Sequence, residues 1–335
     1  MNRTHATARI ITNLQRLWLP AAVAATLLFV NPVTLPAQTT PAERLTQAYA
    51  LERNGHAGTA IPELQALLNG KLLDDAGTAK AWNILANAYQ DEENFADARH
   101  AYEQSVQIYD TLPNRLDDRA MVLDDFGQLY VSTRQFDMAA RLETQALHLY
   151  EQAGDHAGMA RAASHLAGTA FSQGNVAHGS KFLKRAAKEA KLANDLTDDD
   201  RAAIASLQGW QAQLNGNLAA SIIGYEHALA LAKKQHGEEN PATGWSYVLL
   251  GNATAAAGQW TDALDDMRNG LAILDRTMGR QTEHYVIAEL AYSRVLDGAG
   301  FHAEARQIKA EAQPVLQTLS REQCQGCTVT AAAFR

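Results

Sequence analysis

The stretch from Ala79 to Tyr109 limits the fold more than any other, because it reads as two amphipathic helices joined by a short polar turn. In both halves the residues that form one face recur at helical spacing: Trp82, Leu85, Ala86 and Tyr89, then Phe95, Ala98, Tyr102, Ser105 and Val106. The turn Asp91–Asn94 is too short to let the helices part, so they should lie antiparallel and in contact. One such hairpin buries too little apolar surface to fold alone, which predicts further copies.

Comparable hairpins recur along the chain with a period close to 42 residues. Their first helices begin near Pro41, Ala79, Ala120, Ala160, Ala202, Gly244 and Val286. Three columns of mostly small residues fix the register: Ala48, Ala86, Gly127, Ala167, Gly209, Gly251 and Ser293; Ala60, Ala98, Ala139, Gly179, Ser221, Ala263 and Ala305; and Leu67, Ser105, Ala146, Ala186, Ala228, Gly270 and Ala312. Small residues at these positions predict close contact between the paired helices.

These columns resemble the tetratricopeptide repeat, and the second hairpin keeps that pattern best, at Trp82, Leu85, Ala86, Tyr89, Phe95, Ala98, Tyr102 and Ser105. The 42-residue spacing and the connecting segment Gly237–Pro241 resemble the repeats of kinesin light chains. The resemblance covers roughly residues 41 to 319 and implies an all-α, right-handed α-solenoid of about seven hairpins. In the last hairpin, Pro314 predicts that the helix kinks or restarts near Gln313.

Residues 1–37 have the order of a signal peptide, and the repeats then occupy residues 38–319. Arg3, Arg9 and Arg16 precede an apolar run from Leu17 to Val30, which is shorter than a membrane-spanning helix, and small residues follow up to Ala37. We therefore expect cleavage after Ala37 and a periplasmic or secreted protein. An uncleaved anchor is the alternative, which would also place the repeats outside the cytoplasm.

The charge of the exported chain argues against two classes of partner. Without residues 1–37 the chain has 26 basic and 37 acidic residues, a net charge of −11. An acidic surface repels phosphate backbones and anionic lipid headgroups, so neither nucleic acid nor a membrane surface is expected as the main partner. The oligomeric state cannot be inferred from the sequence.

The sequence contains none of the common catalytic or phosphate-binding motifs, so we expect neither an enzyme nor a cofactor. His148, His156, His165 and His178 lack the i, i+4 spacing of a metal site, so no metal is expected and they should be surface or interface residues. Adjacent acidic pairs such as Asp124-Asp125 point in different directions on a helix and are interpreted as solvated faces or caps. The run Thr197–Asp200 resembles a helix-capping box.

The only two cysteines, Cys324 and Cys327, lie in the C-terminal tail, residues 320–335. In an oxidising compartment they are candidates for a small disulfide loop. A redox protein that uses this pair, or a metal-linked one, is an alternative function, although no βαβ unit or second cysteine pair supports either. A structural spacer without a specific ligand is a second alternative.

The family resemblance implies a scaffold that binds a partner protein or extended peptide on the concave face, which the first helix of each hairpin would line. Carried over by position, the partner-binding residues are Asn83, Asn87, Gln90, Asp124, Gln128, Arg161, Ser164, Ser206, Trp210, Gln213, Trp245, Asn252 and Arg294. Amides on this face can pair with an extended peptide backbone, and Trp210 and Trp245 can serve as anchors. The alternative is that both tryptophans pack between adjacent hairpins.

Overall fold

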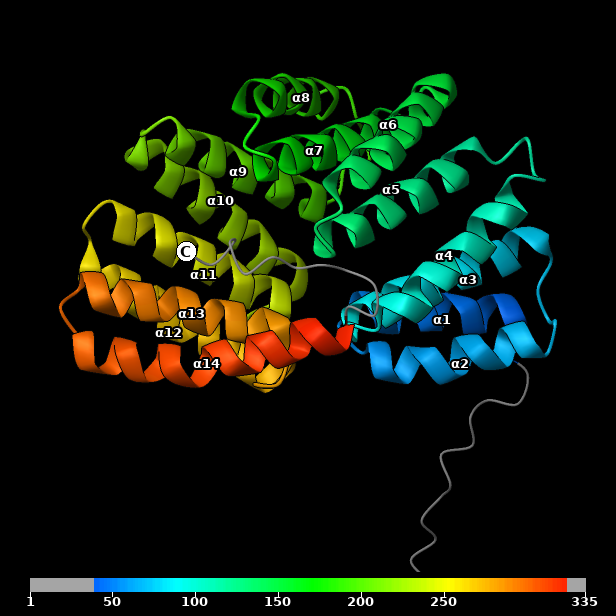
Figure 1. The fold of residues 1–335 in the computed structure, drawn as a ribbon. Helices are drawn as coiled ribbons and strands as arrows, with labels where there is room; N and C mark the ends of the chain where they lie inside the picture. Colours follow the sequence, from blue (N-terminus) through cyan, green and yellow to red (C-terminus); the bar gives the residue numbers. More distant parts are fainter. Residues whose placement is uncertain (1–38, 324–335) are drawn as a thin grey trace, which may run out of the picture. The chain divides into compact units, whose positions relative to one another are not determined.

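The computed structural model describes residues 39–323, and within them the chain forms fourteen α-helices and no strand (Figure 1). Consecutive helices pack as seven hairpins: α1 (Pro41–Arg53) with α2 (Ala57–Asn69), α3 (Asp75–Asp91) with α4 (Phe95–Tyr109), α5 (Leu116–Ser132) with α6 (Phe136–Ala153), α7 (His156–Ser172) with α8 (Val176–Glu189), α9 (Asp198–Leu214) with α10 (Leu218–His236), α11 (Pro241–Ala256) with α12 (Trp260–Thr277), and α13 (Glu283–Gly298) with α14 (His302–Gln323). The predicted all-α solenoid is confirmed. Residues 1–38, which include the expected signal peptide, and Cys324 and Cys327 lie outside the described residues.

The three columns of the repeat lie where the helices touch. Every residue in them is buried, including Leu67, and Ala98, Ala139 and Ala263 expose none of their surface. Some contacts leave no room for any side chain, since a Cβ added to Gly224 of α10 would lie 2.7 Å from the Cα of Gly209 in α9. The register predicted from the small residues is therefore the register of the structure.

The helix ends follow local capping chemistry. Thr197 and Asp200 form the predicted capping box, in which the Thr197 hydroxyl accepts a hydrogen bond from the Asp200 N–H at 3.1 Å. Asn240 caps α11, which has Pro241 in its first turn, where a missing N–H costs little. At the other end of the array, α14 continues through Pro314 to Gln323, so the helix does not restart near Gln313. Ala312 and Leu316 are buried against α13 on either side of Pro314, and this packing outweighs the single lost hydrogen bond.

Each hairpin turns through one residue in the left-handed backbone conformation: Gly55, Glu93, Arg134, Gly174, Gly216, Gly258 and Gly300. Glu93 and Arg134 occupy this conformation at a cost of roughly 1 kcal/mol each, because a Cβ is crowded there. For Glu93 the compensating contacts come from a distant hairpin.

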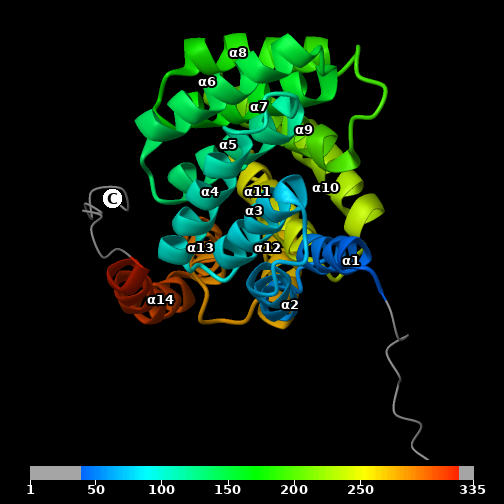
Figure 2. The same ribbon diagram turned by 90° about the vertical axis from the view of Figure 1, so that its right-hand side faces the viewer.

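Hairpins that are far apart in sequence meet among the described residues, where α1 to α4 and α12 to α13 turn their ends toward one another (Figures 1 and 2). The Glu93 carboxylate accepts hydrogen bonds from the Glu283 N–H at 2.8 and 3.1 Å and contacts His284 Nδ1 at 3.2 Å. Arg53, at the end of α1, forms an ion pair with Asp199 at the start of α9. The array therefore curves until its first two hairpins contact the fifth and the seventh.

The first helices lie on the inner side of this curvature. Contacts join α1 to α3, α3 to α5, α5 to α7, α7 to α9 and α11 to α13, which brings first helices of successive hairpins together. The second helices pack mainly against their own partner and against the next first helix. The face predicted to bind a partner is therefore the inner face.

We expect Ala139→Leu to lower the free energy of unfolding by about 1 to 3 kcal/mol, because the added atoms enter a fully packed contact between α5 and α6. Ala50→Leu, at an exposed position in α1, is the matched control and should be nearly neutral. Urea denaturation followed by circular dichroism measures both changes. Equal midpoints for Ala139→Leu and the parent would contradict the register.

Candidate partner-binding site

All the residues predicted to bind a partner lie on first helices: Asn83, Asn87 and Gln90 on α3, Asp124 and Gln128 on α5, Arg161 and Ser164 on α7, Ser206, Trp210 and Gln213 on α9, Trp245 and Asn252 on α11, and Arg294 on α13. Their surroundings differ between the two halves of the array. In the first half all except Ser164 hydrogen-bond to a neighbouring helix, and the Ser164 hydroxyl donates to the Arg161 carbonyl of its own helix at 2.8 Å. In the second half several make no side-chain hydrogen bond among the described residues.

Amides of α3 hold α5 in place through Asp125. The Nδ2 groups of Asn83 and Asn87 lie 2.9 and 3.5 Å from the same Asp125 oxygen. The Tyr102 hydroxyl of α4 donates to Asn87 Oδ1 at 2.6 Å and contacts Gln90 Oε1 at 3.1 Å. These amides are already used to join the second and third hairpins.

The preceding residue, Asp124, faces the other way, toward α7. Its carboxylate exposes none of its surface, receives a hydrogen bond from His165 Nδ1 at 2.9 Å and lies 3.4 Å from Arg161 Nε. Arg161 also donates to the Tyr150 hydroxyl at 2.7 Å. Two adjacent aspartates thus join one helix to both of its neighbours.

A third carboxylate, Glu143 of α6, is fully buried beside this group. Gln128 donates to it at 2.9 Å, and the Thr169 hydroxyl lies 2.9 and 3.0 Å from its two oxygens. Burial, partly offset by His165, raises the pKa of Glu143 to about 7. For His165, burial alone would lower the pKa, but Asp124 and then Glu143 outweigh it and raise the pKa to about 9.

The two tryptophans lie at junctions between hairpins. Trp210 is half-buried, packs against clusters that include Leu183 and Tyr225, and meets Phe171 edge to face at 5.5 Å. Trp245 is half-buried in the cluster around Val248 and approaches His284 edge to face at 6.0 Å. These contacts agree with the packing interpretation, while the exposed part of each ring still faces solvent.

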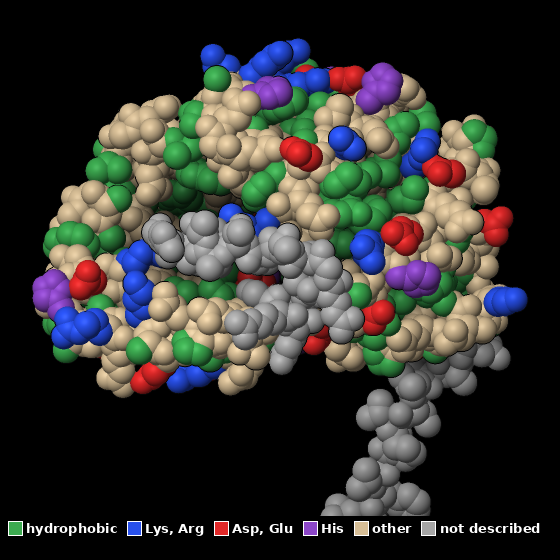
Figure 3. All heavy atoms as spheres, viewed as in Figure 1, with side chains coloured by type: hydrophobic (Ala, Val, Ile, Leu, Met, Phe, Trp, Pro, Cys, Tyr) green, Lys and Arg blue, Asp and Glu red, His purple; other side chains and the backbone are tan. Residues whose placement is uncertain are grey.

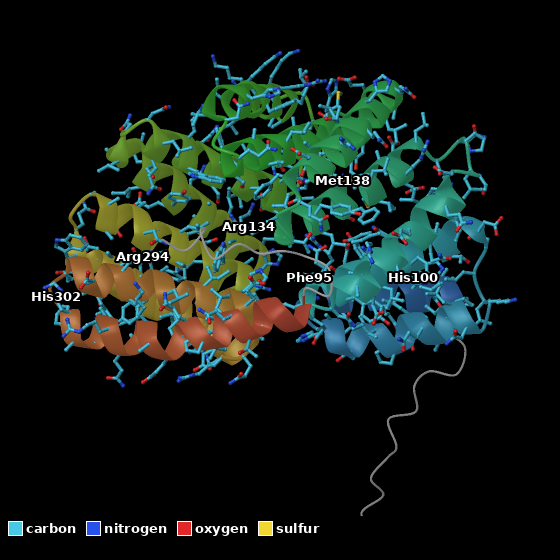
Figure 4. The ribbon with its side chains drawn as sticks, in the orientation of Figure 1. Phe95, His100, Arg134, Met138, Arg294 and His302 are labelled. Atoms are coloured by element: carbon cyan, nitrogen blue, oxygen red, sulfur yellow. The ribbon has the colours of Figure 1, made fainter. Side chains whose placement is uncertain are left out.

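Other inner-face residues of the second half keep unused polar groups. Ser206 and Gln213 are half-buried without a side-chain hydrogen bond among the described residues, and Asn252 uses only Nδ2, which donates to the Val248 carbonyl at 3.1 Å. Arg294 is exposed on α13 and forms no ion pair with the described side chains, residues 39–319 (Figure 4).

Sequence reasoning missed the residues that hold the first half together. Asp124 and Asp125 were interpreted as a solvated face or cap, which is wrong, although their divergent directions were predicted. His165 has the interface position expected for it. The signal that points to the contacts was in the repeat itself, because Asn83 and Asp125, and likewise Asp124 and His165, stand about one period apart.

The sequence also matches a known repeat family. A family model of the tetratricopeptide repeat matches residues 77–152 and 200–276, which cover the second and third and the fifth and sixth hairpins. The four matched hairpins are tetratricopeptide repeats. No curated protein matches the chain.

Solved structures match this array at low identity, and the two with TM-scores above 0.5 share its fold. The APC/C hetero-tetramer Cut9-Hcn1 matches at 15% identity and a TM-score of 0.59, over 90% of this chain and 50% of that chain. A Rap protein complexed with Competence and Sporulation Factor matches at 14% identity and a TM-score of 0.54, over 84% and 91%. A putative kinesin light chain of Podosopora anserina matches at 16% identity and a TM-score of 0.34, over 74% and 99%. This chain thus spans half the length of the Cut9-Hcn1 chain.

Two properties of the described residues concern membranes and metal ions. Among α1 to α14, no helix combines the length and apolar character needed to cross a membrane. Within residues 39–323, no three His, Cys, Asp or Glu side chains gather in a way that could hold a metal ion. On the face shown in Figure 3, acidic, basic and apolar side chains are interspersed.

The protonated His165 predicts a pH dependence of stability. Since its pKa is raised from 6.5 to about 9, the stabilisation is fully present below pH 6.5 and is lost as pH rises through 9. We expect the parent to lose more stability than His165→Gln over this range, by about 1 to 3 kcal/mol. His148→Gln, at an exposed site on α6, should behave as the parent does. Urea midpoints measured across the range check this, and parallel curves for parent and His165→Gln would contradict the assignment.

Proposed function

We propose that this protein is a non-catalytic scaffold that holds a partner protein or extended peptide on the inner face of its repeats. The repeat family and fold support an interaction scaffold. The observation that carries the finer proposal is the set of inner-face groups in the second half that have no partner among the described residues: Ser206, Gln213 and Arg294. Such groups can pair with the backbone and charges of a bound segment, whereas the amides of α3 are already occupied.

The geometry favours the stretch from α9 to α13 within that face. Trp210 and Trp245 lie on successive first helices there, each with part of its ring exposed, and Gln213 and Asn252 supply amides beside them. The Rap protein of similar fold was solved with Competence and Sporulation Factor, which supports a partner-holding role for the fold. An exposed arginine on α13 favours a segment that carries an acidic residue.

Peptides selected from a random-sequence display library test this site. We expect selected peptides to bind the parent saturably and to lose about tenfold or more in affinity to Arg294→Glu, since a favourable charge becomes repulsive. Arg306→Glu is the matched control, because Arg306 is exposed on α14, a second helix, and should leave affinity unchanged. The variant Cys324→Ser, Cys327→Ser should also bind normally.

Three outcomes would remove the proposal. A library without saturable binders would favour a structural spacer. Equal losses in Arg294→Glu and Arg306→Glu would place the site elsewhere. Loss of binding in the double serine variant would favour a function that depends on the cysteine pair.

We further propose that the protein is exported and that its first 37 residues are removed. The order of basic, apolar and small residues before Gln38 supports this. The intact mass of the protein recovered from the envelope or medium should correspond to a chain that begins at Gln38. A cytoplasmic protein that retains Met1 would contradict both export and the disulfide expected at Cys324 and Cys327.

A further inference from the structure

A cavity of about 740 Å³ lies where the first hairpins meet the later ones. Its walls come from the end of α1, the turn between α3 and α4, the start of α9 and the segments that precede α11 and α13. Apolar atoms of Ala57, Pro241 and Met278 line part of it. The cavity is distinct from the inner-face groups of α9 to α13 proposed to hold a partner.

The basic groups in this wall are already paired. Asp199 forms an ion pair with Arg53 and contacts His236 Nε2 at 2.5 Å, and Glu93 contacts His284. Three further carboxylates, Glu52, Asp91 and Glu92, line the cavity without an ion pair among the described residues. The cavity therefore carries an excess of negative charge.

Glu52 is the carboxylate that most requires a partner. Only 8% of its surface is exposed, and its Oε2 has no hydrogen-bond partner within the described part of the chain. An unpaired polar atom at such a depth is costly, since buried carboxylates are normally paired or hydrogen-bonded. Glu92 and Asp91, by contrast, are exposed at the rim.

We propose that this cavity binds an organic cation, an ammonium or guanidinium group, and that the Glu52 carboxylate is its direct partner. The charge excess and the unpaired Oε2 select a cation. The volume exceeds what a single metal ion fills, and no metal-binding group of side chains is present in residues 39–323. The apolar atoms in the wall suit the methylene stem that carries such a group. The cation is either a free diamine or an arginine or lysine side chain of a bound peptide.

Binding should be coupled to release of a proton. Burial, together with the charges of Asp91 and Asp125, raises the pKa of Glu52 to about 8, against the opposing effect of Arg53. Near pH 7 the empty site therefore holds Glu52 mainly protonated, and a cation favours the carboxylate. Affinity should rise with pH up to about 8 and then level off.

Isothermal titration of the full-length protein with agmatine, which carries both an ammonium and a guanidinium group, tests the site. We expect saturable binding that weakens at least tenfold in Glu52→Gln. That variant should lose the rise in affinity near pH 8 and keep only the rise near pH 6 that comes from Asp91, whose pKa burial raises to about 6. Glu103→Gln, at an exposed position on α4, is the matched control and should bind as the parent does. Asp91→Asn, at an exposed site, should weaken binding severalfold without affecting the fold.

The affinity of a peptide that contains one arginine, compared with that of the same peptide containing citrulline, tells whether the cation is a peptide side chain or a free diamine. Tighter binding of the arginine peptide than of agmatine assigns the site to a partner side chain, and binding of agmatine alone assigns it to a free small cation. Because Gln resembles protonated Glu, Glu52→Gln should keep the thermal midpoint of the parent. Absence of saturable binding by both probes, or unchanged affinity in Glu52→Gln and Asp91→Asn, would overturn the proposal. Neither result depends on Arg294, so the proposed inner-face function is tested separately.

Discussion

The close approach of the two helices in each hairpin is the constraint on which the rest of the structure depends. At Gly209 and Gly224 the backbones are so near that even a methyl group would clash, and at Ala98, Ala139 and Ala263 nothing larger than alanine fits without strain. The separation of the two helices is therefore held short in each hairpin. Because the first helices of successive hairpins also pack on one another along the inner side, the array curves until Arg53 contacts Asp199 and Glu93 contacts α13.

The curvature also brings polar side chains of the first helices close together on the inner side. Their contacts differ between the two halves of the array. Between α3 and α7, two adjacent aspartates and the buried Glu143 are paired with amides, a hydroxyl and His165, while Asp124 Oδ2 accepts no hydrogen bond among the described residues. Removal of one partner from this network would leave a buried charge unpaired, which is costly. Ser206, Gln213 and Arg294 make no comparable contacts among the described residues, and they are the groups proposed to bind a partner.

The periodic part of the structure could be predicted from the sequence. The small columns fixed the hairpins and their register because close packing excludes large residues at the same position of every repeat, as at Ala86 and Ala98. The residue with left-handed backbone conformation in each turn was not predicted. Glu93 and Arg134 stand where the other hairpins have glycine, so the position does not show as a column of glycines in the sequence. Contacts that close the curve, such as Glu93 with Glu283, follow from the summed rotation of several hairpins and have no signature in any one of them. Glu52 was missed for the same reason, because its cavity exists only once the array has curved.

The closure that brings the first two hairpins against the fifth and the seventh is the central claim, and a spin-label distance measurement tests it most directly. Labels at Asn54, in the turn of the first hairpin, and at Gln281, before α13, occupy exposed positions on the two sides of the contact. With Cys324 and Cys327 replaced by serine, only the two introduced cysteines take the label. The structure predicts one short and narrow distance distribution. A long, broad distribution in a fully helical protein would show that the array is open in solution, and would contradict both the curvature and the cavity that depends on it.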